Sequence, residues 1–261
     1  MAMTAHGQLV FGQTAHKNGF LFFVFFSTLA SYNFHWFLTP ESRTELERSA
    51  WSHDHKLLHL TLCILGLGGA LYFGLYFLHH FVAIAIAVVL TFLYSAPKIP
   101  LPLFARLRRI AIGKTIYLAF AWTYVTTILP LIFSEKTVTT ADILFCTYRY
   151  FFIYAICILF DYRDRENDRA DGIRSLITYF KEKGINRLFY FSLGLSFLAL
   201  LGWQWQIGWT FDIVLLFAAL PVLAEIYPIA KRNFSDYIYY FLLDGLMAFP
   251  SLTVLVYYQF F

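Results

Sequence analysis

Charge is scarce in this chain, since only 14% of its 261 residues are Asp, Glu, Lys or Arg, against about 25% in an ordinary globular protein. So few charges cannot cover the surface of a soluble domain of this size, and they also exclude a nucleic-acid-binding domain. Cysteine is rare as well, and Cys63, Cys146 and Cys157 all lie inside apolar runs without the spacing of metal ligands. A secreted disulfide scaffold is therefore excluded.

Apolar residues are abundant instead, at 59% of the chain, and aromatic residues reach 21%. This composition excludes intrinsic disorder and indicates an integral membrane protein. A helix needs about 20 apolar residues to cross the hydrocarbon core of a bilayer, because its backbone amides must be satisfied within the segment. The sequence predicts an all-helical transmembrane bundle with eight such spans, at residues 19–38, 57–78, 81–97, 115–133, 143–160, 188–206, 209–227 and 237–260.

The basic residues are distributed unevenly over the loops between these spans. Of the 20 Lys and Arg residues, 17 fall in the loops after the first, third, fifth and seventh spans, and only 2 fall on the other side. Cytoplasmic loops of membrane proteins carry such an excess of Lys and Arg. We therefore predict a multi-pass protein of the cell inner membrane whose loops after residues 38, 97, 160 and 227 face the cytoplasm.

The predicted spans form a single transmembrane domain over residues 1–261, with two four-span halves at about 19–133 and 143–260. With this topology both termini lie outside, although residues 1–18 contain no secretory signal. The stretch Ala5–Phe11 resembles the end of an apolar helix, so we expect a ninth, N-terminal span that has been truncated. A re-entrant N-terminal segment is the alternative.

The fifth span is followed directly by a cluster of carboxylates. If the helix continues past residue 160, four aspartates fall within about 80° of arc on one face, namely Asp161, Asp164, Asp168 and Asp171. Such a stripe requires a positive charge between its members, and oxygen ligands of this kind suit Mg²⁺ shared with substrate phosphates. The alternative is a solvated loop that the interspersed arginines neutralise.

Two segments of the chain resemble the UbiA superfamily of membrane prenyltransferases. Residues 161–172 are similar to the second aspartate-rich motif of that family, at Asp161, Asp164, Glu166, Asp168, Arg169 and Gly172. The segment Leu93–Lys98, which precedes a basic loop and a new span, is similar to the one after the third helix of the family. The resemblance implies an all-helical fold, usually of nine spans. It also implies Mg²⁺-dependent transfer of an isoprenoid chain from its diphosphate to an aromatic or other lipophilic acceptor.

The first aspartate-rich motif of the family is altered here. At the corresponding position the chain reads Asn33 to Glu41, and Phe34 and Phe37 stand where the family has carboxylates. Phenylalanine cannot bind Mg²⁺, so one of the two metal sites that the resemblance implies is weakened or absent. Asn33 and Glu41 are expected to assist only weakly from this motif.

The resemblance assigns roles to particular residues. Asp161, Asp164 and Asp168 are expected to be catalytic and to hold Mg²⁺ against the diphosphate, with Glu41 as a further metal ligand. The predicted substrate-binding residues are Asn33, Lys98, Lys114 and Arg169. Lys98 and Lys114 could equally serve as positive charge near lipid headgroups.

Two other functions stay open at this point. The chain could be an inactive relative of the family with a binding or scaffold role, because its first motif is altered. It could also be a small transporter in which Arg149 and Asp244 mark the pathway, since ionisable residues inside a membrane are often functional. The expected partners are an isoprenyl diphosphate, a lipophilic acceptor and the bilayer, without nucleic acid or an obligate protein partner.

Overall fold

The computed structural model describes residues 17–39, 51, 54–96, 99, 113–135, 137–170, 175–208, 211–249 and 252. In this part of the chain 91% of the residues are helical and no strand is present, which confirms the predicted all-helical fold. Backbone contacts divide the chain into two compact units. We call residues 13–108 the N-terminal unit, and residues 109–261 with residues 1–12 the C-terminal unit.

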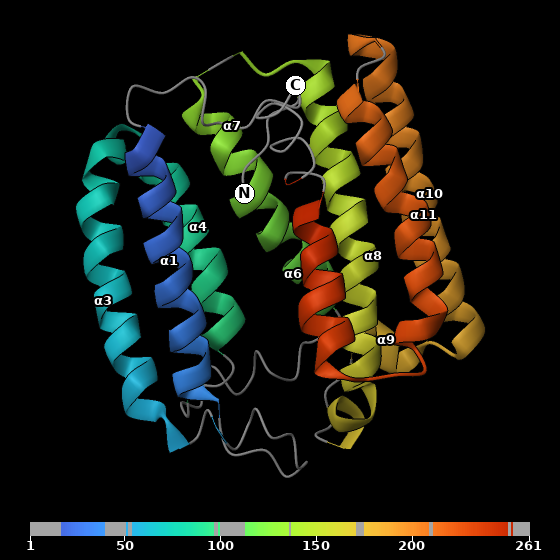
Figure 1. The fold of residues 1–261 in the computed structure, drawn as a ribbon, viewed down its shortest axis with the longest axis horizontal. Coiled ribbons are helices and arrows are strands. Elements are labelled where there is room, and N and C mark those ends of the chain that lie inside the picture. The colour runs from blue at the N-terminus through green and yellow to red at the C-terminus, as the bar shows by residue number, and fades with distance from the viewer. Residues whose placement is uncertain are drawn as a thin grey trace. The chain divides into compact units, whose positions relative to one another are not determined.

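Three apolar helices, seen side by side in Figure 1, form the described part of the N-terminal unit: α1 (Lys17–Leu38), α3 (Lys56–Gly74) and α4 (Phe81–Ser95). A short 3₁₀ segment, η2 (Leu75–His80), joins α3 to α4. Within it Phe77 has φ −119° and ψ 21°, which lie outside the helical range. The break divides a 40-residue apolar stretch, Lys56–Ser95, into two spans, as the sequence predicts.

A close approach between α1 and α3 depends on Gly66. A Cβ atom at this position would lie 2.6 Å from the backbone nitrogen of Ala30 and 2.9 Å from the carbonyl oxygen of Phe26. We expect Gly66→Ala to lower the free energy of unfolding by about 1–3 kcal/mol, because the two backbones must separate. Thermal unfolding of the detergent-solubilised protein measures this change.

Gly68, two residues further along α3, provides a matched control. A Cβ atom there would meet no atom within 4 Å. Because alanine favours a helix over glycine by about 1 kcal/mol, Gly68→Ala should leave the stability unchanged or raise it. Equal losses in both variants would contradict the proposed close packing at Gly66.

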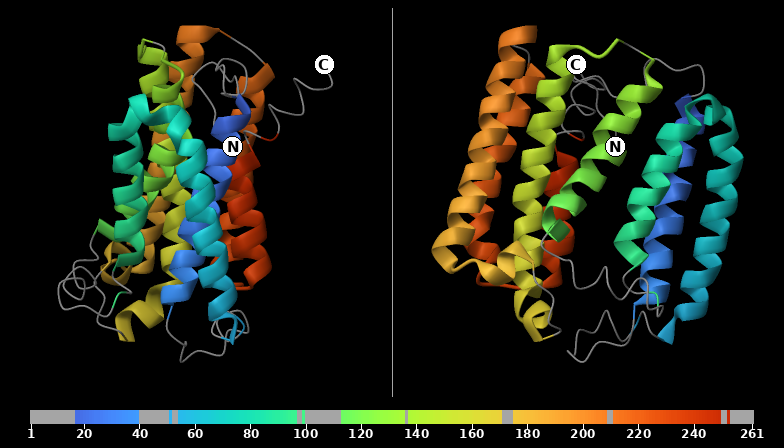
Figure 2. Two further views of the ribbon diagram at one scale, coloured as in Figure 1. Left: turned by 90° about the vertical axis from the view of Figure 1, so that its left-hand side faces the viewer. Right: turned by 180° about the vertical axis from the view of Figure 1, so that it is seen from behind.

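The C-terminal unit is built around one long helix, α8, whose side chains at Tyr148, Phe152, Ile156 and Leu159 are fully buried. α8 packs against α10 and α6, and Figure 2 shows α6 and α7 running obliquely to it. The elements of this unit are α6 (Lys114–Thr123), η5 (Tyr124–Ile128), α7 (Leu129–Phe133), α8 (Thr140–Ala170), α9 (Leu176–Tyr179), α10 (Glu182–Ile207), α11 (Phe211–Ala230) and η6 (Tyr237–Leu243).

The described residues form about six to eight apolar helices, which fits the predicted polytopic bundle. Six helical stretches are long and apolar enough to cross a membrane, and the break at η2 divides one of them in two. The shorter apolar helix Tyr237–Phe249 lies in the last predicted span. Gly208, at φ 82°, ends α10 at the predicted turn between the sixth and seventh spans. The predicted ninth span precedes residue 17 and lies outside the described residues, and the division into two four-span halves stays a prediction.

α8 is longer than a membrane span requires. Its 31 residues extend for about 46 Å at about 1.5 Å per residue, while the hydrocarbon core is about 30 Å thick. Seven of the last ten residues, 161–170, are charged, so this part of the helix lies beyond the hydrocarbon. The helix therefore continues past residue 160, which is the condition under which the aspartates share one face. We call residues 161–170 the α8 extension.

Candidate functional site

The α8 extension brings two of the predicted aspartates together with a lysine from α6. Asp161 and Asp168 are two helical turns apart and share one face of the extension, and both are buried. The Lys114 ammonium lies 3.6 Å from Oδ1 of Asp161 and 3.1 Å from Oδ2 of Asp168. The hydroxyl of Thr115 donates a hydrogen bond to the other carboxylate oxygen of Asp161.

This arrangement satisfies the electrostatic requirement of an acidic stripe. A buried carboxylate is stable only when it is paired and hydrogen-bonded. Lys114 supplies the positive charge for both aspartates, and its position at the first turn of α6 places it beside the extension. The Lys114 side chain is 30% exposed, whereas the side chains of Asp161 and Asp168 are covered.

Asp164 has a different environment from the other two aspartates. Its side chain is 41% exposed, and its carboxylate accepts a hydrogen bond of 2.9 Å from Nε of Arg163. The Arg163 guanidinium also donates to the hydroxyl of Tyr240 and lies 4.7 Å from the ring centre of Tyr239. Asp164 therefore belongs to the acidic stripe by helical position, while its closest charged partner is Arg163 rather than Lys114.

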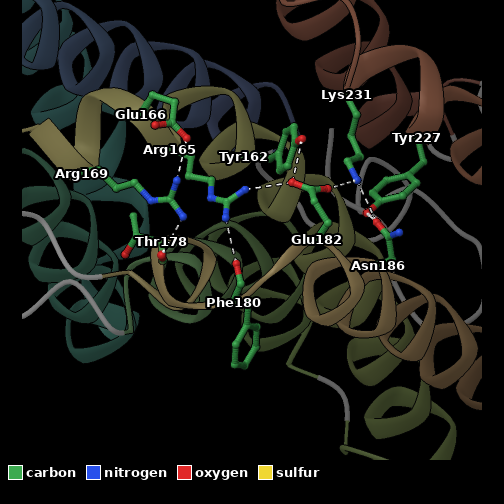
Figure 3. A network of polar contacts seen from close by, with 10 residues as sticks. All are labelled: Tyr162, Arg165, Glu166, Arg169, Thr178, Phe180, Glu182, Asn186, Tyr227 and Lys231. Atoms are coloured by element: carbon green, nitrogen blue, oxygen red, sulfur yellow. Dashed lines mark hydrogen bonds and ion pairs between the residues drawn. The ribbon is translucent and has the colours of Figure 1, made fainter.

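Arg169 contributes to a polar network on the neighbouring face of the extension, which Figure 3 shows. Its guanidinium pairs with Glu166 at 2.8 Å and donates to the carbonyl oxygen of Thr178 at 3.2 Å. The same network includes Arg165 and Glu182, whose side chains form an ion pair of 2.9 Å. The predicted contact of Arg169 with substrate stays a prediction, because the contacts seen here are all within the protein.

Asn33 lies in the N-terminal unit, and its side-chain amide forms hydrogen bonds with two neighbouring residues. Its amide nitrogen donates to the carbonyl oxygen of Leu29, and its amide oxygen accepts a 2.8 Å hydrogen bond from Nδ1 of His59. Next to it in sequence, Phe34 stacks on Phe92 with ring centres 6.3 Å apart. In the described part of the altered first motif, Asn33 therefore bonds to a backbone carbonyl group and an imidazole, and Phe34 stacks on an aromatic ring.

Several predicted residues lie outside the described part of the chain, namely Glu41, Lys98, Asp171 and Gly172. Their roles stay predictions. Arg149, which marked the transporter alternative, is buried within α8 and donates from both terminal nitrogens to the carbonyl oxygen of Met247.

Sequence reasoning missed three residues that complete these contacts. Thr115 follows the predicted Lys114 directly, so its place beside Asp161 could have been inferred once Lys114 was assigned to the site. Glu182 lies 17 residues from Arg165 in another helix, and His59 lies 26 residues from Asn33. No periodic signal in the sequence identifies these two pairs.

Comparison with protein families matches residues 53–243 to the UbiA prenyltransferase family. The chain belongs to this family. The matched region includes Lys114 and the whole α8 extension, whereas Asn33 precedes it. Neither the curated proteins nor the solved structures with which the chain was compared include a match.

Family membership and the apolar helices establish a multi-pass membrane protein. The UbiA family generally comprises membrane prenyltransferases, which argues against the transporter alternative.

Proposed function

We propose that this UbiA family member is an active, Mg²⁺-dependent prenyltransferase that moves an isoprenoid chain from its diphosphate to a lipophilic or aromatic acceptor. The observation that best supports this proposal is the cluster of Asp161, Asp168 and Lys114 at the end of a membrane-crossing helix. A solvated loop neutralised by arginines would leave these carboxylates exposed, whereas both are buried and share one lysine.

The residues of this cluster fit a magnesium ion. Asp161 and Asp168 offer carboxylate oxygens, and the nearby Thr115 adds a hydroxyl oxygen. Mg²⁺ prefers oxygen ligands, and it usually binds through one or two carboxylates together with substrate phosphates. We therefore assign Asp161 and Asp168 as the main ligands and Asp164 as a weaker one, because its carboxylate is bound to Arg163.

The reaction places defined demands on these side chains. The bond between the isoprenoid carbon and the diphosphate oxygen breaks, and its electron pair leaves with the diphosphate. The acceptor then bonds to that carbon and loses a proton. When bound, Mg²⁺ would neutralise charge on the leaving diphosphate. Lys114 would donate to a phosphate oxygen, since its ammonium group lies beside both carboxylates and its side chain is partly exposed.

The same proposal includes the location of the site. The α8 extension belongs to the loop after the fifth span, which is one of the loops that together carry 17 of the 20 basic residues. We place this side of the protein in the cytoplasm and the helices in the inner membrane, following the distribution of positive charge.

The experiment that tests this function uses purified protein in nanodiscs with farnesyl or geranylgeranyl diphosphate. We expect Mg²⁺-dependent binding of one of these diphosphates and release of pyrophosphate, both lost with EDTA and restored by added Mg²⁺. Binding without release of pyrophosphate, even with lipid extracts added as acceptor, would favour the inactive relative with a binding role. Absence of Mg²⁺-dependent binding of either diphosphate would overturn the proposal.

A further inference from the structure

The α8 extension carries, beside its acidic stripe, a second face that ties it to two other helices. Tyr162 and Arg165 contact Glu182 in α10, and Arg169 contacts Thr178 in α9 (Figure 3). These three positions lie about 50–110° around the helix from the mean direction of Asp161 and Asp168. Arg165 is the centre of these contacts. Its Nη1 atom lies 2.9 Å from Oε1 of Glu182, and its Nη2 atom donates to the carbonyl oxygen of Phe180 at 3.0 Å.

Glu182, in the first turn of α10, connects the extension to Lys231, the residue directly after α11. Its Oε1 atom accepts from Arg165 and from the hydroxyl of Tyr162, which lies 3.1 Å away. Its Oε2 atom pairs with the ammonium of Lys231 at 2.7 Å. Lys231 also donates to Oδ1 of Asn186 at 2.8 Å, so α10 and α11 hold the Glu182 carboxylate in place.

The extension needs such external support because it is a poor helix by itself. The extension continues α8 and needs no new nucleus, but seven of its ten residues are charged, and in proteins most helical stability comes from tertiary packing of an apolar face. Asp161, Asp164 and Asp168 repel one another along one face, and the last carbonyl groups of any helix lack partners within it. Asp168 shares the Lys114 ammonium with Asp161 only while the two helical turns between them stay intact.

We propose that Glu182, acting through Arg165, is a positioning residue that keeps the α8 extension helical and so holds Asp168 next to Lys114 and Asp161. This inference rests on the proposed function for its effect on metal and diphosphate binding. Its structural part, the ordering of residues 161–170 by Glu182, does not depend on any activity.

The two ion pairs of Glu182 allow a sharp test. Arg165→Gln removes the ion pair between α8 and α10, Glu182→Gln removes both ion pairs, and Lys231→Gln leaves the Arg165–Glu182 pair in place. Lys183→Gln serves as the control, because Lys183 is exposed on the same turn as Glu182. Hydrogen–deuterium exchange of the amides of residues 162–170 reports the order of the extension, and electron paramagnetic resonance of Mn²⁺, standing in for Mg²⁺, reports metal binding.

We expect faster amide exchange and about tenfold weaker Mn²⁺ binding in Arg165→Gln and Glu182→Gln, the size of effect that outer-shell residues of metal sites commonly have. The KM for the isoprenyl diphosphate should rise more than kcat falls. Arg165→Lys, which keeps the charge, should recover part of the loss. Lys231→Gln should lower the melting temperature while leaving exchange in residues 162–170 and Mn²⁺ binding close to wild type.

Two results would overturn the inference. Unchanged exchange in Arg165→Gln and Glu182→Gln would show that Glu182 does not order the extension. If Lys231→Gln weakens Mn²⁺ binding as much as Arg165→Gln and Glu182→Gln do, the cause is a general loss of stability and not a loss of positioning. If Glu182→Gln fails to fold, the comparison of Arg165→Gln with Arg165→Lys shows whether the charge of Arg165 orders the extension. Wild-type protein that binds no Mn²⁺ would overturn the proposed function, while the exchange measurement would still test the ordering role.

Discussion

Replacing Asp161 with asparagine should abolish Mg²⁺-dependent release of pyrophosphate, with a loss of at least about 100-fold, or about 2.7 kcal/mol in the barrier. Asparagine keeps the size of the side chain, and its amide oxygen can still accept the hydrogen bond from Thr115. It loses the negative charge that pairs with Lys114 and that would hold Mg²⁺. The change therefore removes the proposed chemistry with little disturbance of the packing, and steady-state assays in nanodiscs measure it.

The matched control for this substitution is Asp142→Asn at the other end of the same helix. Asp142 is also buried, and its carboxylate accepts hydrogen bonds from the backbone and hydroxyl groups of Thr139. The same chemical change there should leave turnover within about twofold of wild type, an effect below about 0.5 kcal/mol. Turnover near wild type in Asp161→Asn, or equal losses in both variants, would contradict the assignment of Asp161.

The hydropathy of the sequence was enough to predict most of the fold. Each span is a long apolar run, and the clear separation of basic loops predicted how the spans alternate across the membrane. The regular spacing of the carboxylates after residue 160 also predicted a shared face, which the continuous helix to Ala170 confirms. These features are local, because they depend on residues within about 20 positions of one another.

The partners of that face could not be predicted in the same way. Lys114 and Thr115 lie 54 and 46 residues before the carboxylates that they contact. Helical periodicity identifies which residues point in one direction, but the packing of helices determines what they meet there. For the same reason the sequence treats Asp164 as equal to Asp161 and Asp168, whereas the structure pairs it with Arg163. The sequence position of Lys114 is likewise compatible both with phosphate binding and with a place near lipid headgroups.

Replacing Lys114 with methionine should have opposite effects on metal binding and on catalysis. Methionine keeps an unbranched apolar side chain and removes the ammonium group that lies between Asp161 and Asp168. Two unit charges about 4 Å apart near a protein surface interact by about 4 kcal/mol, and the partial exposure of Lys114 reduces this value. Without the ammonium, the two carboxylates repel each other and attract a divalent cation more strongly.

We therefore expect Lys114→Met to bind Mn²⁺ at least about tenfold more tightly than wild type in the absence of diphosphate, a change of about 1.4 kcal/mol. Mg²⁺ should also raise its melting temperature by more than it raises that of the wild type, because a cation that binds only the folded state stabilises it.

With isoprenyl diphosphate present, turnover of Lys114→Met should fall by about 10–100-fold, about 1.4–2.7 kcal/mol, since the departing diphosphate loses a hydrogen-bond donor. Lys114→Arg, which retains the charge, should stay closer to wild type in both measurements, and Lys183→Met on an exposed turn should change neither. If Lys114→Met binds Mn²⁺ no more tightly than wild type, the ammonium does not compete with a metal ion for Asp161 and Asp168. If its turnover is also unchanged, Lys114 serves the fold alone.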